Sequence, residues 1–119
     1  MYIWSGTKIK ELRDSLTIDI LKEKYQWVLD AEIENAIIGL KEDKIIWYDG
    51  IWRSGAWIYG IWKNGTWMSG VWHNGIWENG NLNYGLWKNG IWENGNWWNG
   101  TWENGFKAIS EGCRGTKRS

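Results

Sequence analysis

The side chains that most often perform catalysis are scarce in this chain and do not converge. There is one histidine, His73, and one cysteine, Cys113, and they lie far apart in the sequence. Glu78, Glu93 and Glu103 recur at a repeat spacing, which spreads carboxylates along a face, whereas paired acid–base catalysis needs them to converge. The sequence contains no phosphate-binding glycine loop and no His/Cys metal-ligand cluster. We therefore expect no enzyme activity, no cofactor and no metal site.

The other chemistry open to the chain is aromatic, and it is carried by a repeat. A five-residue unit of the form x-Trp-x-Asn-Gly occurs twelve times between Ile46 and Gly105, as in Ile61-Trp62-Lys63-Asn64-Gly65. Its second position holds eleven of the fourteen tryptophans, and only Leu82 interrupts that column. A strict period predicts that every unit presents the same side chains at the same angles, so one repeated structure should span half of the chain.

The parity of the unit distinguishes two β architectures. If Asn-Gly formed two-residue hairpin turns, each unit would be a three-residue strand reversing at both ends. The first and third residues of such a strand direct their backbone polar groups to the same neighbour, whereas an antiparallel meander needs them to pair with opposite neighbours. A coil that never reverses avoids the conflict. We therefore predict a mainly β fold, a repeat β-solenoid of five-residue units with an N-terminal helical cap, and keep a single-layer antiparallel β-meander as the alternative.

A solenoid places the tryptophans inside. In Gly-x-Trp-x-Asn the glycine and the indole both face the axis, so the smallest side chain makes room for the largest. The first position, mostly β-branched or apolar, then points outward, either as ordinary strand surface or as an interaction face. The inverse arrangement, with the tryptophans outside, would make an aromatic platform for sugars or nucleobases, at the cost of eleven exposed indoles.

The period resembles that of the pentapeptide-repeat family, whose units place a small residue and a Leu or Phe, two apart, inside a square right-handed β-helix. Here glycine and tryptophan take those positions. The resemblance implies four units per coil, so that residues twenty apart stack about 4.8 Å from each other and twelve units form a stub roughly 15 Å tall. The Gly-x-Trp-x-Asn-Gly string is also similar to the core of MORN repeats, which form β-hairpin arrays. Tandem x-Trp-x-x-Gly arrays resemble those in uncharacterised tailed-phage proteins, which carry no assigned activity.

A four-unit coil brings together outward side chains that lie twenty residues apart. One such column would be apolar and would contain Ile51, Val71 and Ile91. The column beside it would contain Arg53, His73 and Glu93. A further column would join Ile58, Glu78 and Trp98, with Tyr59 next to it.

Units that depart from the rule are the best candidates for recognition, because variable outward positions carry the specificity of repeat proteins. The unit 81–85 has Leu82 in place of tryptophan and gains Tyr84, while the units 56–60 and 96–100 carry an extra aromatic residue outside. The predicted binding residues are Ile58, Tyr59, Glu78, Leu82, Tyr84 and Trp98. The column of Ile58, Glu78 and Trp98, with Tyr59 beside it, would stack a planar ligand; the alternative is that these surface aromatics are incidental.

Three other segments flank the repeat. Residues 1–30 carry a helical stripe, with Thr7 and Ser15 as candidate N-caps, and we expect one helix or two short ones covering an open end of the solenoid. Residues 31–45 contain two β-like runs joined by a polar stretch, which predicts a hairpin leading into the repeat at 46–105. Residues 106–119 lose the period and end in basic and polar residues, and we expect disorder there.

Charge and composition limit the possible partners. Fourteen basic residues balance fourteen acidic ones, so no bulk attraction to nucleic acid or to anionic membrane is expected. The single cysteine and the absence of a signal-like segment indicate a cytoplasmic protein, in the host cytoplasm if it is viral. We expect a non-enzymatic repeat scaffold that mediates protein–protein interaction or assembly, with a protein partner or a second copy of the chain. The alternative is a binder of a small planar ligand or glycan, for example a nucleotide-sequestering protein.

Overall fold

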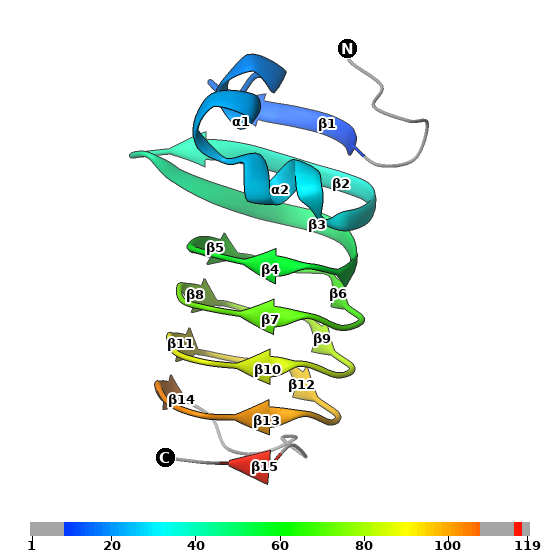
Figure 1. Cartoon of the computed structure of the whole chain (residues 1–119), viewed down its shortest axis with the longest axis vertical. Helices are drawn as coiled ribbons and strands as arrows, with labels where there is room; N and C mark the ends of the chain where they lie inside the picture. Colours follow the sequence, from blue (N-terminus) through cyan, green and yellow to red (C-terminus); the bar gives the residue numbers. More distant parts are fainter. Residues whose placement is uncertain (1–8, 108–115, 118–119) are drawn as a thin grey trace.

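The computed structural model, which describes residues 9–107 and 116–117, is a parallel β-solenoid closed at its N-terminal end by a hairpin and two short helices (Figure 1). Every strand pair within the repeat is parallel. The solenoid prediction is therefore confirmed, and the antiparallel meander is excluded.

Three units, and not four, complete one coil. The strand registers join residues fifteen apart, such as Trp47 with Trp62 and Trp62 with Trp77. The square cross-section implied by the pentapeptide-repeat family is therefore wrong, and the twelve units make four coils instead of three. The five-residue period fixes the length of each side of the coil, but the bend at each corner depends on the backbone angles there.

The predicted columns of residues twenty apart are wrong for the same reason, because a step of twenty residues moves the chain to another side of a three-sided coil. The strands align the side that begins at Ile51 with the one at Thr66, and Ala56 with Val71, and Ile76 with Ile91. Each proposed column of three, including Ile58, Glu78 and Trp98, is thus spread over all three sides.

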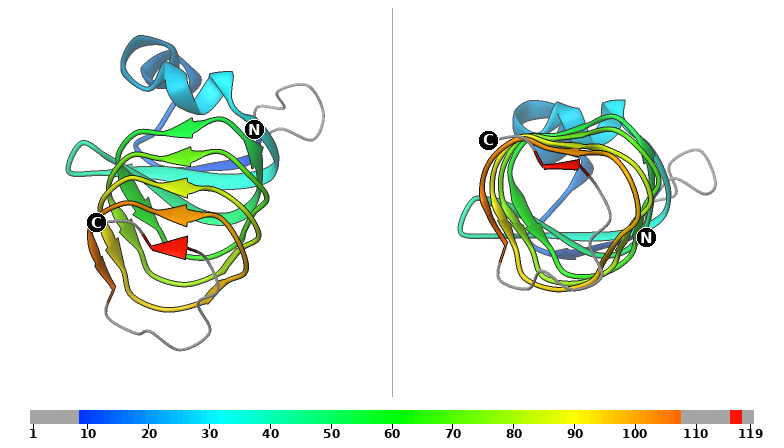
Figure 2. Two further views of the ribbon diagram at one scale, coloured as in Figure 1. Left: turned by 60° about the horizontal axis from the view of Figure 1, so that its bottom comes forward. Right: turned by 90° about the horizontal axis from the view of Figure 1, so that it is seen from below.

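We name the three sides face A, face B and face C in chain order, and Figure 2 shows them along the solenoid axis. Face A consists of the first half of β3 (Lys44–Ser54) with β5 (Gly60–Trp62), β8 (Ile76–Trp77), β11 (Ile91–Trp92) and β14 (Phe106–Lys107). Face B consists of the second half of β3 with β6 (Thr66–Trp67), β9 (Asn81–Leu82) and β12 (Asn96–Trp97). Face C consists of β4 (Ala56–Trp57), β7 (Val71–Trp72), β10 (Leu86–Trp87), β13 (Thr101–Trp102) and β15 (Thr116–Lys117).

Each unit is tied to the preceding coil by a regular set of backbone hydrogen bonds. The residue at the third position donates its N–H to a tryptophan carbonyl sixteen residues earlier, as from Lys63 to Trp47 at 2.8 Å. The residue at the first position donates to a glycine carbonyl in the same way, as from Val71 to Gly55 at 3.0 Å. The ladder runs along the axis, and it satisfies the backbone on all three faces.

The core is a triangular stack of indole rings, as predicted from the second position. Ten of the repeat tryptophans have an exposed fraction of 1 % or less. Rings fifteen residues apart are stacked, with centroids 4.7–5.0 Å apart and planes within 4–10°. Rings five residues apart meet edge to face, for example Trp67 and Trp72 at 5.9 Å and 67°. Both geometries are favourable for aromatic pairs, so each buried ring contributes ring contacts in addition to its large apolar area.

This packing has a polar cost. The same ten indole N–H groups are buried and have no hydrogen-bond partner among the protein atoms of the described residues. Burying a donor without a partner costs about 1–3 kcal/mol in mutational data. The ring contacts and the area buried by each indole must exceed that cost for the solenoid to be stable.

The repeat glycines form the corners of the coil. Gly75 has a φ of +126°, and a Cβ built on it would lie 2.3 Å from the carbonyl oxygen of Gly60 in the preceding coil. Gly65 has the same conformation, and its Cβ would lie 3.0 Å from Nε1 of Trp47. The glycine thus makes room for an indole, as expected, but it is also required by its positive φ and by the close approach of successive coils.

The N-terminal cap differs in part from the prediction. Residues 9–14, expected to be helical, form the strand β1 (Ile9–Asp14), which pairs in parallel with β2 (Glu32–Lys41). The edge of β2 needs a backbone partner, and that tertiary pairing outweighs a helical stripe only two turns long. Helix α1 (Ile18–Lys24) follows, with Thr17 as its N-cap in place of Thr7 or Ser15: the Thr17 hydroxyl accepts from the Ile20 N–H at 3.1 Å.

The cap is joined to the first coil by a hairpin and by an aromatic contact. β2 and β3 are antiparallel and turn at Glu42 and Asp43, which both have positive φ, as a tight hairpin requires. Helix α2 (Gln26–Asp30) lies against β4, where Trp27 meets the Trp57 ring edge to face at 5.2 Å. The Tyr25 hydroxyl donates to the Asp43 carbonyl at 3.0 Å and fastens the helices to the hairpin tip.

The solenoid continues past Gly105. β14 pairs with β11 and β15 pairs with β13, so the expected disorder does not hold for residues 106–107 and 116–117. The rest of that prediction falls on residues 108–115 and 118–119, which lie outside the described residues together with Cys113 and Thr7.

Candidate binding faces

The structure distributes the predicted binding residues over the surface and the core. Ile58 and Tyr59 are exposed at the corner between faces C and A, and Glu78 lies at the corner between faces A and B. Tyr84 and Trp98 are exposed at the corner between faces B and C, by 57 % and 48 %. The exposed residues therefore do not form one cluster: among them, only Tyr84 and Trp98 come from neighbouring coils of the same face.

Leu82 is part of the core and not of the surface. Its exposed fraction is 1 %, and it takes the place of one ring in the face B stack, between Trp67 and Trp97. Because leucine is smaller than tryptophan, Trp97 makes a contact that occurs nowhere else among the described rings: it meets Trp87, ten residues earlier, at 6.0 Å and 65°. Leu82 can therefore influence a surface site only through the backbone of its unit.

The unit around Leu82 also has an altered backbone. Gly85 is the one glycine at the end of a unit, from Gly50 to Gly105, that lacks a positive φ. It follows Tyr84, the most exposed of the large apolar residues. The loss of the ring at Leu82 and the changed corner at Gly85 thus flank the exposed phenol.

The corner between faces A and B carries most of the charge of the repeat. Lys63 and Glu78 occupy successive coils and form an ion pair at 3.4 Å, and Glu93 lies in the coil after Glu78. The two glutamates are thus on adjacent rungs, about 4.8 Å apart along the axis. The four-unit coil had placed them on different columns.

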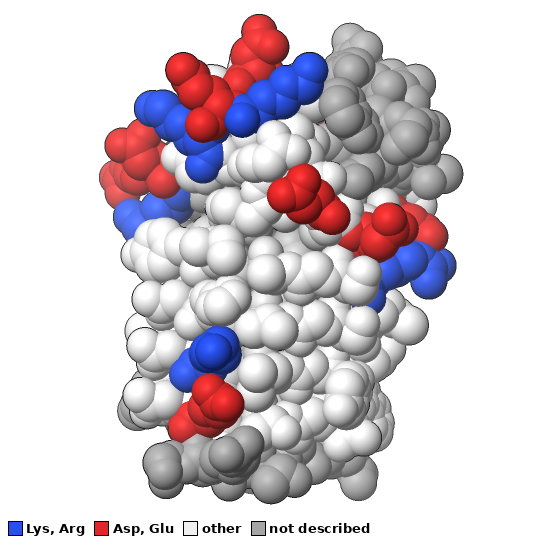
Figure 3. All heavy atoms as spheres, in the orientation of Figure 1, with Lys and Arg blue, Asp and Glu red and all other residues white. Residues whose placement is uncertain are grey.

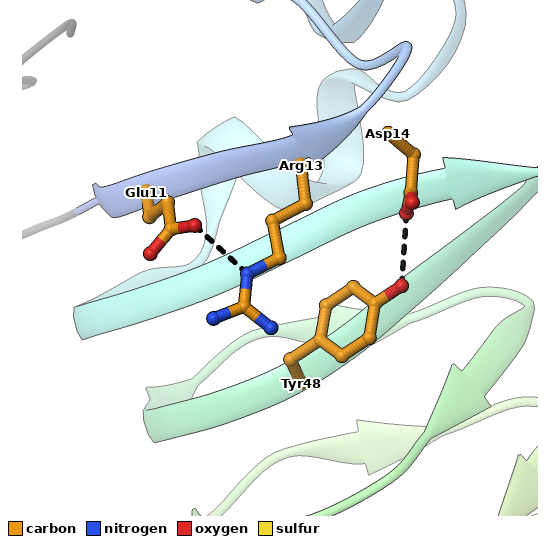
Figure 4. Close-up of polar contacts among 4 residues, drawn as sticks. All are labelled: Glu11, Arg13, Asp14 and Tyr48. Atoms are coloured by element: carbon orange, nitrogen blue, oxygen red, sulfur yellow. Dashed lines mark hydrogen bonds and ion pairs between the residues drawn. The ribbon is translucent and has the colours of Figure 1, made fainter.

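Tyr48 begins this corner and fastens it to the cap (Figure 4). Its hydroxyl donates to the Asp14 carboxylate at 2.9 Å, and the Arg13 guanidinium lies 4.9 Å from the centre of its ring. Arg13 in turn donates to Glu11 at 2.8 Å, and that hydrogen bond raises the pKa of the guanidinium above its ordinary value. These contacts fix β1 against the first coil and leave Tyr48 engaged in the fold.

Face C, by contrast, is neutral. Its first-position residues, Ala56, Val71, Leu86 and Thr101, are partly exposed and uncharged. In the space-filling view this face is in front. The charged side chains lie beyond its upper end, at its right edge, or in one basic and acidic pair to the left of its lower half (Figure 3). Five of the six exposed large apolar side chains lie in the corners on either side of it: Ile58, Tyr59, Met68, Tyr84 and Trp98.

Face B changes character along the axis. Near the cap it carries the charged pair Arg53 and Glu34, in which the guanidinium donates a hydrogen bond to the carboxylate. This hydrogen bond, and after it the negative charge of Glu34, raises the pKa of the Arg53 guanidinium. In the last two coils the first position is asparagine instead of Ile51 or Thr66, and Asn96 donates its amide N–H to the side-chain oxygen of Asn81 at 2.9 Å. The binding residues predicted from the sequence did not include Asn81 or Asn96. Alignment at a spacing of fifteen would have placed them one above the other.

Neither a metal centre nor a transmembrane helix is found in residues 9–107 and 116–117. No group of three or more His, Cys, Asp or Glu side chains there could hold a metal ion. No helix within the same ranges has the length and apolar character needed to cross a membrane.

The fold and its surface define a three-sided parallel β-solenoid with a tryptophan core, a neutral face C and an asparagine-rich end of face B. No family model, no curated protein and no solved structure matches the chain significantly. A role for these surfaces therefore has to be argued from their own chemistry.

Proposed function

We propose that this protein is a non-enzymatic repeat scaffold that mediates protein–protein assembly through face C. The observation that carries the proposal is the concentration of exposed apolar side chains in the two corners that border a face without charge. The centres of protein interfaces are depleted of charged residues and enriched in aromatic residues and methionine, which matches Tyr59, Met68, Tyr84 and Trp98.

A second copy of the chain is the partner that this surface fits best. In a two-fold symmetric dimer the same patch meets itself, so a charged patch would face its own sign. The strands of face C avoid that repulsion, and the two charged residues at its corner with face A, Lys88 and Glu103, have opposite signs. The corner between faces A and B would instead bring Glu78 and Glu93 against their copies. The rigid core supports the role, since a stack of buried rings holds face C in one shape.

Light scattering coupled to size-exclusion chromatography tests the proposal on the full chain. We expect a dimer at micromolar concentration, and we expect Leu86→Glu to shift it to monomer, because the change puts a charge in the centre of face C. Ile76→Glu is the matched control, since Ile76 is partly exposed at the same position of face A and should leave the dimer intact. A monomer at every concentration, or a dimer that survives Leu86→Glu, would refute assembly through face C.

A further inference from the structure

The two units that have asparagine at their first position are vertical neighbours on face B. Asn81 pairs with Asn96 in register, and Leu82 pairs with Trp97. The backbone N–H of Trp98 donates to the carbonyl of Leu82 at 2.8 Å, which places Trp98 on the rung next to Asn83. Departures at 81–85 and 96–100 are fifteen residues apart in sequence, but they form one continuous surface.

These departures oppose the stability of the fold. Asparagine is a poor strand residue, yet it occupies the first position in both units, where the other strands of face B have Ile51 and Thr66. Leu82 gives up a stacked ring, and Trp98 and Tyr84 are about half exposed. Local sequence that conflicts with its own fold is expected at functional sites, and these departures of the units 81–85 and 96–100 fall on one patch.

The side chains of this patch are suited to bind hydroxyl groups through hydrogen bonds. Asn81, Asn83 and Asn96 each present an amide with two donor hydrogens and an acceptor oxygen. The bond between Asn96 and Asn81, and the contact of the Asn83 amide with the Met68 sulfur at 3.3 Å, use only part of that capacity. The indole of Trp98 and the phenol of Tyr84 add flat apolar faces beside these amides.

The surrounding charge narrows the class of ligand. Within the two units, all ten residues are uncharged. The nearest titratable corner of the same coils, between faces A and B, contributes Glu78 and Glu93, and Lys88 lies at the corner between faces C and A. A phosphate-bearing ligand would meet carboxylates and no arginine or lysine fork, which disfavours nucleotides and nucleic acid.

We infer that Asn81, Asn83, Tyr84, Asn96 and Trp98 form a binding site for a neutral oligosaccharide. A pyranose ring presents an apolar face of C–H groups, which packs on the Trp98 indole, and equatorial hydroxyls, which bond to the amides of the asparagines. First and third positions of a strand lie about 7 Å apart, and successive rungs about 4.8 Å apart, so the amides and the ring surround an area that one or two sugar rings fill.

An NMR titration of the full chain tests the site. The probe is a panel of neutral oligosaccharides with gluco, manno, galacto, xylo and N-acetylglucosamine units, each taken to millimolar concentration, with ATP as the anionic comparison. We expect at least one sugar to shift the side-chain amide signals of Asn81, Asn83 and Asn96 and the indole signal of Trp98 in a saturable way. The indole signals of the ten buried rings serve as an internal reference that should not move.

Two variants locate the binding without unfolding the coil. Asn96→Ile introduces isoleucine, the commonest residue at the first position, and Trp98→Lys uses a residue already present at the third position. Each should weaken the affinity at least tenfold. Tyr59→Ala, which removes an exposed aromatic ring from a different corner, is the matched control and should not weaken the affinity for the sugar.

The outcomes separate this site from the proposed assembly surface. No shift with any sugar of the panel, binding that persists in both face B variants, or a stronger response to ATP would overturn the inference. Tyr84 and Trp98 also border face C, so the titration is repeated on the Leu86→Glu variant, in which the proposed dimer cannot cover them. We expect that variant to bind the sugar at least as tightly as the unmodified chain. If neither the unmodified chain nor the Leu86→Glu variant binds any sugar while the unmodified chain is still a dimer, the sugar site alone is rejected.

Discussion

At the scale of single residues, the chain alternates two extreme side chains. Tryptophan fills the interior, and glycine allows successive coils to approach at the corners. Trp72, for example, stacks on Trp57 and Trp87 at 4.9 and 4.7 Å and meets Trp67 and Trp77 edge to face. Four ring contacts depend on that one side chain.

Truncation of a core ring should therefore be severe. We expect Trp72→Ala to lower the free energy of unfolding by about 3–5 kcal/mol, the usual cost of deleting a large buried aromatic. Trp98→Ala, at the surface, should change it by less than about 0.5 kcal/mol. Urea unfolding followed by far-ultraviolet circular dichroism measures both, and equal effects would contradict a buried ladder.

The corner glycines make a second residue-scale prediction. Gly75→Ala forces a positive φ on alanine and drives its Cβ against the Gly60 carbonyl at 2.3 Å. We expect a loss of about 3 kcal/mol or more from strain and overlap together. Gly85→Ala should cost less, because Gly85 has no positive φ and its closest contact is the Trp67 side chain at 2.8 Å. The same unfolding assay compares them, and the reverse order would refute this account of the corners.

At the scale of elements, the strands of the repeat are only two or three residues long, apart from β3, and none could be stable alone. Each depends on the strands fifteen residues before and after it. Side chains at the same position of successive coils therefore interact across the ladder, as opposite residues do in any sheet. The column of Tyr48, Lys63, Glu78 and Glu93 shows this most directly, because it mixes both charges.

Reversing one charge in that column should have a small, salt-sensitive effect. Lys63→Glu replaces an ion pair with three successive carboxylates, and we expect a loss of about 0.5–1 kcal/mol at low salt. Added salt should reduce the loss by screening. The combined change Lys63→Glu and Glu78→Lys restores opposite charges at these two positions and should recover the stability in the same assay; if it does not, the two side chains do not interact across coils.

At the scale of the whole molecule, the cap and the coils are stacked along the single axis of the solenoid. The cap closes the N-terminal end through Trp27, and β14 and β15 extend the solenoid beyond Gly105. Since each coil contacts only its neighbours, stability should be a sum over coils and their interfaces. Each proposed functional surface lies on or beside one face of the solenoid, and the number of residues per coil decides which residues share a face.

Deletion of one coil tests this organisation. Removing residues 61–75 takes out one full turn, so every later residue keeps its face and its inward or outward direction. We expect a folded, less stable protein whose tryptophan fluorescence stays blue-shifted. Removing residues 61–74 shifts the phase by one position and should expose the rings, with red-shifted and quenchable emission. Two equally folded variants would contradict a coil of fifteen residues.

The sequence by itself determined the unit, the interior tryptophans and the parallel coil. A strict period of five carries that information locally, and the parity of a five-residue unit excludes simple hairpins. Prediction ended where geometry depends on summed backbone angles. Whether three or four corners close a coil depends on the bend angle at each glycine, and the presence of glycine does not specify that angle. The resemblance to a square β-helix therefore gave the wrong columns.

Only the tertiary structure decided which surface residues are neighbours. It separated Ile58, Glu78 and Trp98, moved Leu82 into the core, and placed Asn81 above Asn96. Residues 9–14 also form a strand instead of a helix, because backbone pairing with the edge of β2 outweighs the local helical preference of a short amphipathic stripe. The physical reason is common to these cases: contacts across coils join residues fifteen apart or from separate segments, and their energies outweigh local preferences that the sequence displays.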